Sequence, residues 1–274
     1  MTRAVQKLSL FSRIAVRAER EVAFDSPDHL MPWGTMRDSS RNRLFNAKLY
    51  ALFRNRFRAG SENPVKVLDL GCSGGGFVSD CLKDGCIAVG LEGSDYSKKH
   101  KRGEWLTIPE FLFTCDITKN FDVFAGADGK EEPLMFDMVT SWEVMEHISD
   151  SDIAIVAKNV KKHLAVGGLW VMSVSPNDDI VNGVNLHQTV QPKAWWIAKM
   201  KEAGLEHVEA YVDYFNTQFV RGPKYGAAGS FHLIVTNDRD RAPEIPAEAF
   251  QKRLYDRWIG SNFQKLLLRW LVGP

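Results

Sequence analysis

The chain has 274 residues, a length that suits one large α/β domain with appended segments. Its 35 lysine and arginine residues nearly balance its 34 acidic residues. A nucleic-acid-binding protein usually carries a basic excess, so we expect no nucleic-acid partner. Apolar runs of about 18 residues are absent from the sequence, which predicts no transmembrane segment. No signal peptide is evident either, and the four cysteines do not have the spacing of a zinc site, so we expect a cytoplasmic protein.

The N-terminal part has two different patterns. Residues 1–20 space apolar and basic side chains as an amphipathic helix does, whereas residues 25–44 are rich in turn formers and predict a loop. A helix over residues 44–57 is expected next. Together these features predict an N-terminal helical segment, residues 1–57, in which Trp33 is a candidate for a lid over the site.

From residue 64 onward, strand and helix patterns alternate. Strands are expected at residues 65–70, 87–91, 111–115, 136–141, 169–174, 208–215 and 230–236, and helices from the glycine turn to residue 83, at 151–164 and at 192–203. This order predicts an α/β domain with a seven-stranded, mostly parallel sheet and helices on both faces. The last two strands have no expected helix between them and predict an antiparallel hairpin. The domain is expected to span residues 58–240.

The C-terminal part, residues 241–274, is predicted to be a helical extension. Two prolines mark a linker, and one or two helices follow whose apolar side chains recur about four residues apart beside several basic ones. We expect these helices to pack on the domain or to form a homodimer, with attachment to a membrane surface as the alternative.

The strongest motif is a buried strand that runs into a glycine cluster, VKVLDLGCSGGGF at residues 65–77. Asp69 precedes Gly71 by two residues, and Ser73 and Gly75 continue the turn. Glycines permit a tight turn and let a ligand approach the backbone. A cofactor site is therefore expected at this edge of the sheet.

A second acidic residue supports the same site. Glu92, followed by Gly93, ends the next predicted strand, where a carboxylate can accept hydrogen bonds from both ribose hydroxyls of a nucleoside. A dinucleotide-binding enzyme would have a glycine at the position of Ser73. An NAD-type dehydrogenase is therefore the weaker alternative.

These motifs, in this order, resemble those of the class I S-adenosylmethionine (SAM)-dependent methyltransferases, over roughly residues 64–237. The resemblance implies a Rossmann-like domain, SAM as cofactor and a glycine turn that lies against the methionine part of SAM. It also implies that Asp116 accepts from the adenine amino group, that the Ile117 backbone meets the ring, and that the strand ending at Trp142 leads into the reaction site. Within this family the chain resembles the subgroup that methylates oxygen atoms of small molecules.

The acceptor side follows directly in the sequence as Glu143, Glu146 and His147, with a second histidine at His187. Three interpretations stay open. A histidine can act as general base on a hydroxyl. The four side chains could instead bind a divalent metal, because their spacing resembles the metal motif of ubiquinone-pathway and small-RNA terminal 2′-O-methyltransferases. The acids could also simply cap a helix.

We therefore predict an enzyme that transfers a methyl group from SAM to an oxygen of a small molecule or sugar. His147 and His187 are the expected catalytic residues, and no metal is assigned. The alternatives are a methyltransferase-like module that binds SAM without turnover, and the dehydrogenase named above.

Overall fold

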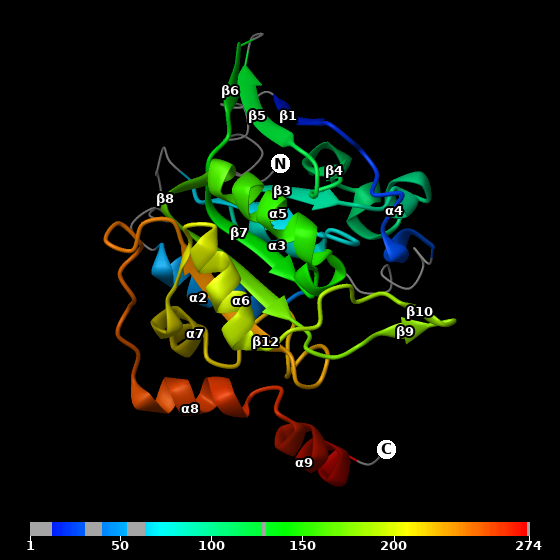
Figure 1. Cartoon of the computed structure of the whole chain (residues 1–274). Coiled ribbons are helices and arrows are strands. Elements are labelled where there is room, and N and C mark those ends of the chain that lie inside the picture. Colours follow the sequence, from blue (N-terminus) through cyan, green and yellow to red (C-terminus); the bar gives the residue numbers. More distant parts are fainter. Residues whose placement is uncertain (1–12, 31–39, 54–63, 128–129, 273–274) are drawn as a thin grey trace.

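The computed structural model describes residues 13–30, 40–53, 64–127 and 130–272 (Figure 1). Its centre is a seven-stranded sheet. In spatial order its strands are β11 (Glu206–His207), β12 (Phe231–Thr236), β8 (Leu164–Val174), β7 (Phe136–Trp142), β2 (Lys66–Leu70), β3 (Ile87–Glu92) and β4 (Leu112–Thr114). The five strands from β8 to β4 are parallel, and β12 pairs antiparallel with both of its neighbours. The predicted seven-stranded, mostly parallel sheet is confirmed.

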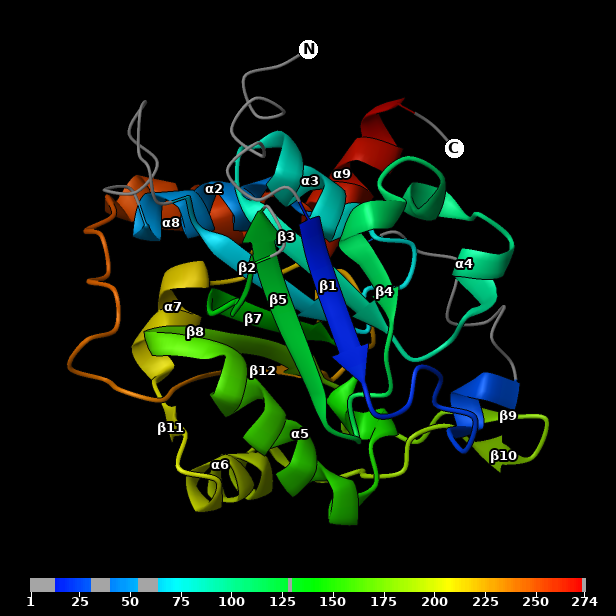
Figure 2. The same cartoon turned by 90° about the horizontal axis from the view of Figure 1, so that it is seen from above.

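Helices cover both faces of this sheet (Figure 2). One face carries α2 and α3, and the other carries α5 and α6. The α-helices are α2 (Arg43–Leu52), α3 (Gly76–Lys83), α4 (Tyr96–Lys99), α5 (Asp150–His163), α6 (Lys193–Glu202), α7 (Glu209–Phe215), α8 (Phe250–Trp258) and α9 (Asn262–Val272). Short 3-10 turns are η2 (Pro27–Leu30), η3 (Gly103–Leu106), η4 (Pro109–Phe111) and η5 (Met145–His147).

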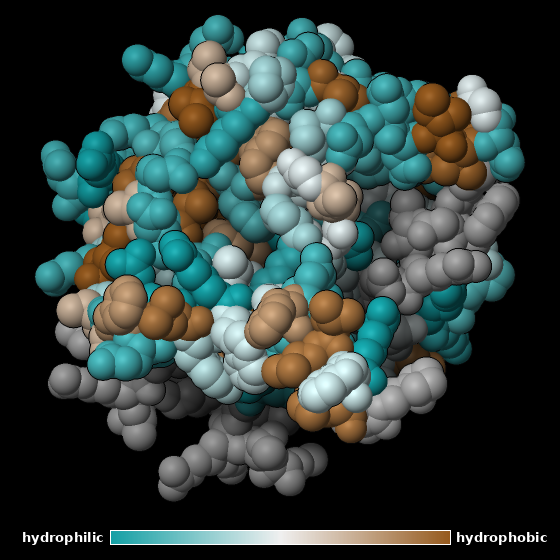
Figure 3. Space-filling view, turned by 90° about the horizontal axis from the view of Figure 1, so that it is seen from below, coloured by the Kyte–Doolittle hydropathy of each residue, from teal (hydrophilic) through white to brown (hydrophobic). Residues whose placement is uncertain are grey.

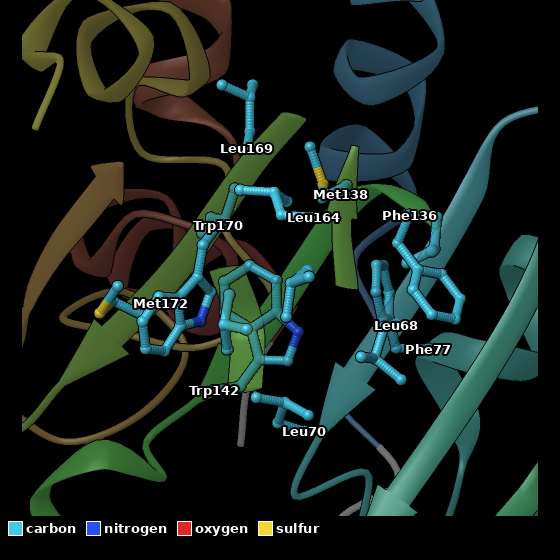
Figure 4. Packing of buried hydrophobic residues seen from close by; sticks show 14 of the residues in the cluster. Leu68, Leu70, Phe77, Phe136, Met138, Trp142, Leu164, Leu169, Trp170 and Met172 are labelled. Atoms are coloured by element: carbon cyan, nitrogen blue, oxygen red, sulfur yellow. The ribbon is translucent and has the colours of Figure 1, made fainter. Parts of the chain in front are cut away.

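The central strands are buried on both faces, which explains why strands such as β2 and β3 consist mostly of apolar residues. Leu68 of β2 and Trp170 of β8 are buried on one face of the sheet, and Met138 of β7 is buried on the other (Figure 4). The indole of Trp170 also donates to Ser141 Oγ at 3.0 Å, so its polar atom is satisfied inside the core. This rigid centre fixes the carboxyl ends of the strands, where the site lies.

The predicted N-terminal helix is wrong where it can be compared. Residues 13–18 form strand β1 (Arg13–Ala18), which pairs antiparallel with β5 (Phe121–Ala127), and β5 pairs with β6 (Lys130–Pro133). Ile14 is buried on β1. Pairing with a partner about a hundred residues away decides the conformation here, and sequence periodicity does not show such a partner. Residues 1–12 and Trp33 lie outside the described part of the chain.

The strand predicted at residues 208–215 is also wrong. After the two-residue strand β11, this segment is helix α7, and a helix therefore does separate the last two strands of the sheet. Tyr211, Tyr214 and Phe215 are buried, at the i, i+3 and i+4 spacing of one helical face. The sequence predicts a strand here because the segment is rich in aromatic and β-branched residues, which favour strands locally.

The C-terminal extension consists of two helices, as predicted, and a buried amine connects the first of them to the domain. Lys48 of α2 is 3% exposed, and its Nζ lies 2.6 Å from Glu248 Oε2 and 2.8 Å from Asp256 Oδ2. The same amine donates to the Tyr214 carbonyl at 2.8 Å. Within the ranges that the structure describes, no helix combines the length and apolarity needed to cross a membrane.

Candidate functional site

A cavity of about 840 Å³ lies at the carboxyl ends of β2, β3 and β7, within the roughly 300–1,000 Å³ usual for small-molecule sites. It brings together nearly all of the site residues expected from the sequence. These are Asp69, Gly71, Ser73, Glu92, Gly93, Asp116, Ile117, Trp142, His147 and His187. Gly75 is outside the lining and instead caps α3, with φ +80° and no room for a Cβ beside Leu112.

The glycine turn is shaped by left-handed backbone at Gly71 (φ +68°) and Ser73 (φ +49°). A Cβ at Gly71 would lie 2.4 Å from Val144 Cγ2, so only glycine fits there. Serine in this conformation is strained by roughly 1–2 kcal/mol. Two contacts offset the strain: the Ser73 amide donates to Glu92 Oε2 at 2.7 Å, and its carbonyl accepts from the Trp105 indole at 2.8 Å.

Glu92 therefore both stabilises the glycine turn, through the Ser73 amide, and lines the cavity. Its other oxygen, Oε1, accepts from the Ser94 amide at 3.2 Å. Burial raises the pKa of Glu92, although these backbone donors oppose the shift. Each carboxylate oxygen can accept a second hydrogen bond, so the group can still accept from a ligand.

Asp69, on strand β2 before the glycine turn, is only 2% exposed. Thr140 Oγ1 donates to its Oδ1 at 2.6 Å. Burial raises the pKa of Asp69 to about 7, against the opposing effect of that hydrogen bond. A positively charged group in the cavity would favour its ionised form.

Asp116 has a partner that the sequence did not suggest. Arg20 Nε donates to Asp116 Oδ2 at 2.5 Å, and the amide and hydroxyl of Thr118 donate to Oδ1 at 2.9 and 2.7 Å. Arg20 follows β1 and also lines the cavity. Both oxygens of Asp116 are thus already engaged, which restricts the role expected for it at an adenine amino group.

Glu143 follows β7 in left-handed backbone (φ +55°), and its carboxylate is fully engaged. Arg221 Nε donates to Oε2 at 2.6 Å, and the Ala227 amide donates to Oε1 at 2.9 Å. The helical turn η5 begins only at Met145. Glu143 therefore does not lie on the same helical turn as Glu146 and His147.

Glu146 is completely buried and only partly satisfied. Oε1 accepts from the Ser175 amide at 2.7 Å, while Oε2 is buried without a hydrogen-bond partner in the described part of the chain. Burial raises the pKa of Glu146 to about 7, and the neighbouring charge of His147 opposes this shift. Its backbone carbonyl accepts from the amides of Gln188 and Thr189, which joins η5 to the loop that carries His187.

The two histidines meet in the cavity, with ring centroids 4.6 Å apart and rings perpendicular. His147 Nδ1 lies 2.9 Å from Asp28 Oδ2, and His187 Nδ1 contacts the Asn177 carbonyl oxygen at 2.5 Å. Burial by itself lowers the pKa of His147, but Asp28 and then Glu146 outweigh it and raise the pKa to about 9. Nδ1 of each ring thus faces an oxygen atom of the protein, in an ion-pair contact at His147 and in a hydrogen bond at His187, and Nε2 is the nitrogen left for a ligand.

Asp28, Arg20 and Asn177 are the site residues that sequence reasoning missed. Asp28 and Arg20 belong to the N-terminal segment, and no local pattern relates them to the strands they reach. The metal interpretation gains no geometric support, because no group of three or more His, Cys, Asp or Glu side chains within the described ranges is arranged to hold a metal ion.

Residues 41–217, more than half of the chain, match a family model described as a methyltransferase domain. The chain belongs to this methyltransferase family. No curated protein matches it significantly. The family match and the fold identify it as a class I SAM-dependent methyltransferase, an enzyme with S-adenosyl-L-methionine as cofactor.

Solved structures share the fold at low sequence identity. A SAM-dependent methyltransferase from Clostridium acetobutylicum is 11% identical with a TM-score of 0.50, and the match covers 77% of this chain and 96% of that one. A sugar N-methyltransferase from Streptoalloteichus is 14% identical (TM-score 0.45, coverage 76% and 92%). A 1,6-didemethyltoxoflavin N1-methyltransferase from Burkholderia thailandensis is 15% identical (TM-score 0.47, coverage 77% and 83%).

Proposed function

We propose that this methyltransferase transfers the methyl group of SAM to an oxygen atom of a small molecule or sugar. When bound, SAM supplies a methyl group that its positive sulfur already activates. The protein then has to align the acceptor and remove its proton.

The wall formed by the glycine turn fits SAM. The buried Asp69 and the partly buried Glu92 place two carboxylates in the wall of a cavity that would take a cationic ligand, and the Trp142 indole nitrogen is buried there without a partner in the described part of the chain. We assign Glu92 to the ribose hydroxyls and the Ile117 backbone to the adenine ring. Because Asp116 is already paired with Arg20, we assign this pair to the wall beside the adenine.

The observation that carries the oxygen acceptor is the pair of imidazoles in the cavity whose Nδ1 atoms each face an oxygen atom of the protein. A hydroxyl must lose its proton as the methyl group is transferred, whereas an amine can attack as a neutral base. Asp28 behind His147 makes that ring a stronger base, and the Asn177 carbonyl fixes the tautomer of His187 with Nε2 free to accept. Either ring can therefore take the proton of an acceptor hydroxyl.

The test is release of S-adenosylhomocysteine from SAM with a library of sugars and small hydroxylated molecules. Replacement of His147 or His187 by alanine should lower turnover on the true acceptor by about 10²-fold or more, with little change in SAM affinity. His100→Ala, at an exposed position outside the cavity lining, is the matched control.

Three other results of these assays would contradict the proposal. Full turnover in both histidine variants would refute the general-base roles. Loss of activity with a chelator and recovery with Mg²⁺ or Mn²⁺ would favour the metal interpretation. Tight SAM binding with no turnover on any acceptor would identify a SAM-binding module rather than an oxygen methyltransferase.

A further inference from the structure

Helices α8 and α9 carry nine of the fifteen large apolar side chains that are exposed in the described part of the chain. They lie together at one side of the molecule (Figure 1), and Figure 3 views this side and shows hydrophobic residues among hydrophilic ones. The exposed fraction is 70% at Phe250 and 79% at Trp270. The other large apolar side chains exposed on these helices are Leu254, Tyr255, Trp258, Phe263, Leu266, Leu268 and Leu271. A patch of this kind marks an interaction surface.

The charges beside this patch have one sign. The exposed charged residues of the segment 250–272 are all basic: Lys252, Arg253, Arg257, Lys265 and Arg269. The single acid there, Asp256, is buried and paired with Lys48. Lys252 also pairs with Glu248, but the four remaining cations have no acidic partner among the residues that the structure describes. The surface is thus both apolar and cationic.

We propose that α8 and α9 form a docking surface for an anionic lipid membrane. Amphipathic helices that combine tryptophan, phenylalanine and leucine with lysine and arginine bind in the interface of such bilayers. A symmetric homodimer through this surface would bring the same cations of two copies together, because a two-fold contact uses the same patch on both subunits. An anionic bilayer satisfies the cations and the apolar side chains together.

The docking surface is connected to the cavity. Lys224 Nζ donates to the Asp256 carbonyl at 2.9 Å, and the Tyr225 hydroxyl lies 3.5 Å from the Ile259 carbonyl oxygen. The same loop supplies Arg221 and Ala227 to the cavity lining. A membrane bound at α8 and α9 would therefore lie next to a segment of the cavity wall.

The test is flotation of the full chain with vesicles of phosphatidylcholine alone or mixed with phosphatidylserine. We expect binding only to the mixed vesicles, and weaker binding as salt is added. Trp270→Ser should lower the partition coefficient by about tenfold. The double change Lys265→Gln with Arg269→Gln should lower it by roughly tenfold or more. Leu106→Ser and Lys130→Gln, at exposed positions elsewhere, are the matched controls and should bind as the unaltered chain does.

SAM affinity, measured on every variant, verifies that the fold is retained. Absence of binding to anionic vesicles by the folded, unaltered chain would overturn the proposal. It would also be overturned if both vesicle types bound equally. Sedimentation as a dimer that Trp270→Ser converts to a monomer, without any vesicle binding, would show a self-association surface instead.

Discussion

Asp28→Asn is the most informative single change in the acceptor end of the cavity. The Asp28 carboxylate lies 2.9 Å from His147 Nδ1 and is the main cause that keeps the pKa of this ring at about 9 despite burial. At pH 7 a group with that pKa is only about 1% neutral, because the pH is two units below its pKa. Asparagine keeps the shape but removes the charge, so the pKa of His147 should fall and the neutral ring should dominate at pH 7.

NMR titration of the imidazole reads this shift directly and needs no acceptor. Where an acceptor is known, kcat/KM of the unaltered enzyme should rise with pH toward 9 if His147 is the base, and the midpoint should move to lower pH in Asp28→Asn. Asp25→Asn, which removes a more exposed partner of Arg20 instead, is the matched control. A His147 that titrates near 6.5 in the unaltered chain, or one that Asp28→Asn leaves unmoved, would refute this account.

The same pair predicts a pH dependence of stability. A histidine whose folded-state pKa is raised from 6.5 to about 9 contributes stability in full below about 6.5 and loses it as the pH rises through 9. The melting temperature of the unaltered chain should therefore decline over this window, and the decline should be smaller in Asp28→Asn.

Three further changes test other parts of the molecule. Glu92→Gln should raise the SAM dissociation constant at least tenfold in calorimetry, since hydrogen bonds to charged groups contribute about 1.5–3 kcal/mol. Glu132→Gln on the exposed strand β6 is the control and should leave the dissociation constant unchanged. In urea unfolding, Gly71→Ala should lower the free energy of unfolding more than Gly85→Ala does. Both glycines have positive φ, but only a Cβ at position 71 meets another side chain. Equal losses of stability in the two variants would contradict the steric clash at position 71. Lys48→Met should cost about 3–5 kcal/mol because it leaves the buried Asp256 carboxylate without its closest cation, and a near-neutral effect would show that this network adds little.

The sheet could be predicted from the sequence because its central strands have a local signature. Strands such as β2 and β3 are buried on both faces and consist mostly of apolar residues, and the glycine turn after β2 needs residue types that few other structures need. The cofactor site proposed at one end of the cavity rests on the same reasoning, since parallel strands bring their carboxyl ends to one edge.

Strand β1 and helix α7 were not predicted, because their conformation depends on distant partners. Six residues of β1 form a strand only because β5 provides hydrogen-bond partners. In α7, aromatic and β-branched residues favour a strand locally, whereas packing of Phe215 on Phe45 of α2, with ring centroids 4.8 Å apart, supports the helix. The sequence does not predict Asp28 and Arg20 as site residues for the same reason, since they reach the site from a segment with no periodic pattern.

The N-terminal segment connects the two ends of the cavity. Arg20 pairs with Asp116 at the cofactor end, Asp28 pairs with His147 at the acceptor end, and between them the Ala23 amide donates to the Gly93 carbonyl at 2.9 Å. If His147 acts as the base, it must be neutral to accept a proton, yet its protonated form is the one that attracts Asp28 most strongly. Deprotonation of His147 before catalysis therefore also weakens the ion pair that attaches η2 to the cavity wall. The protonation state of His147 and the stability of this attachment are thermodynamically linked.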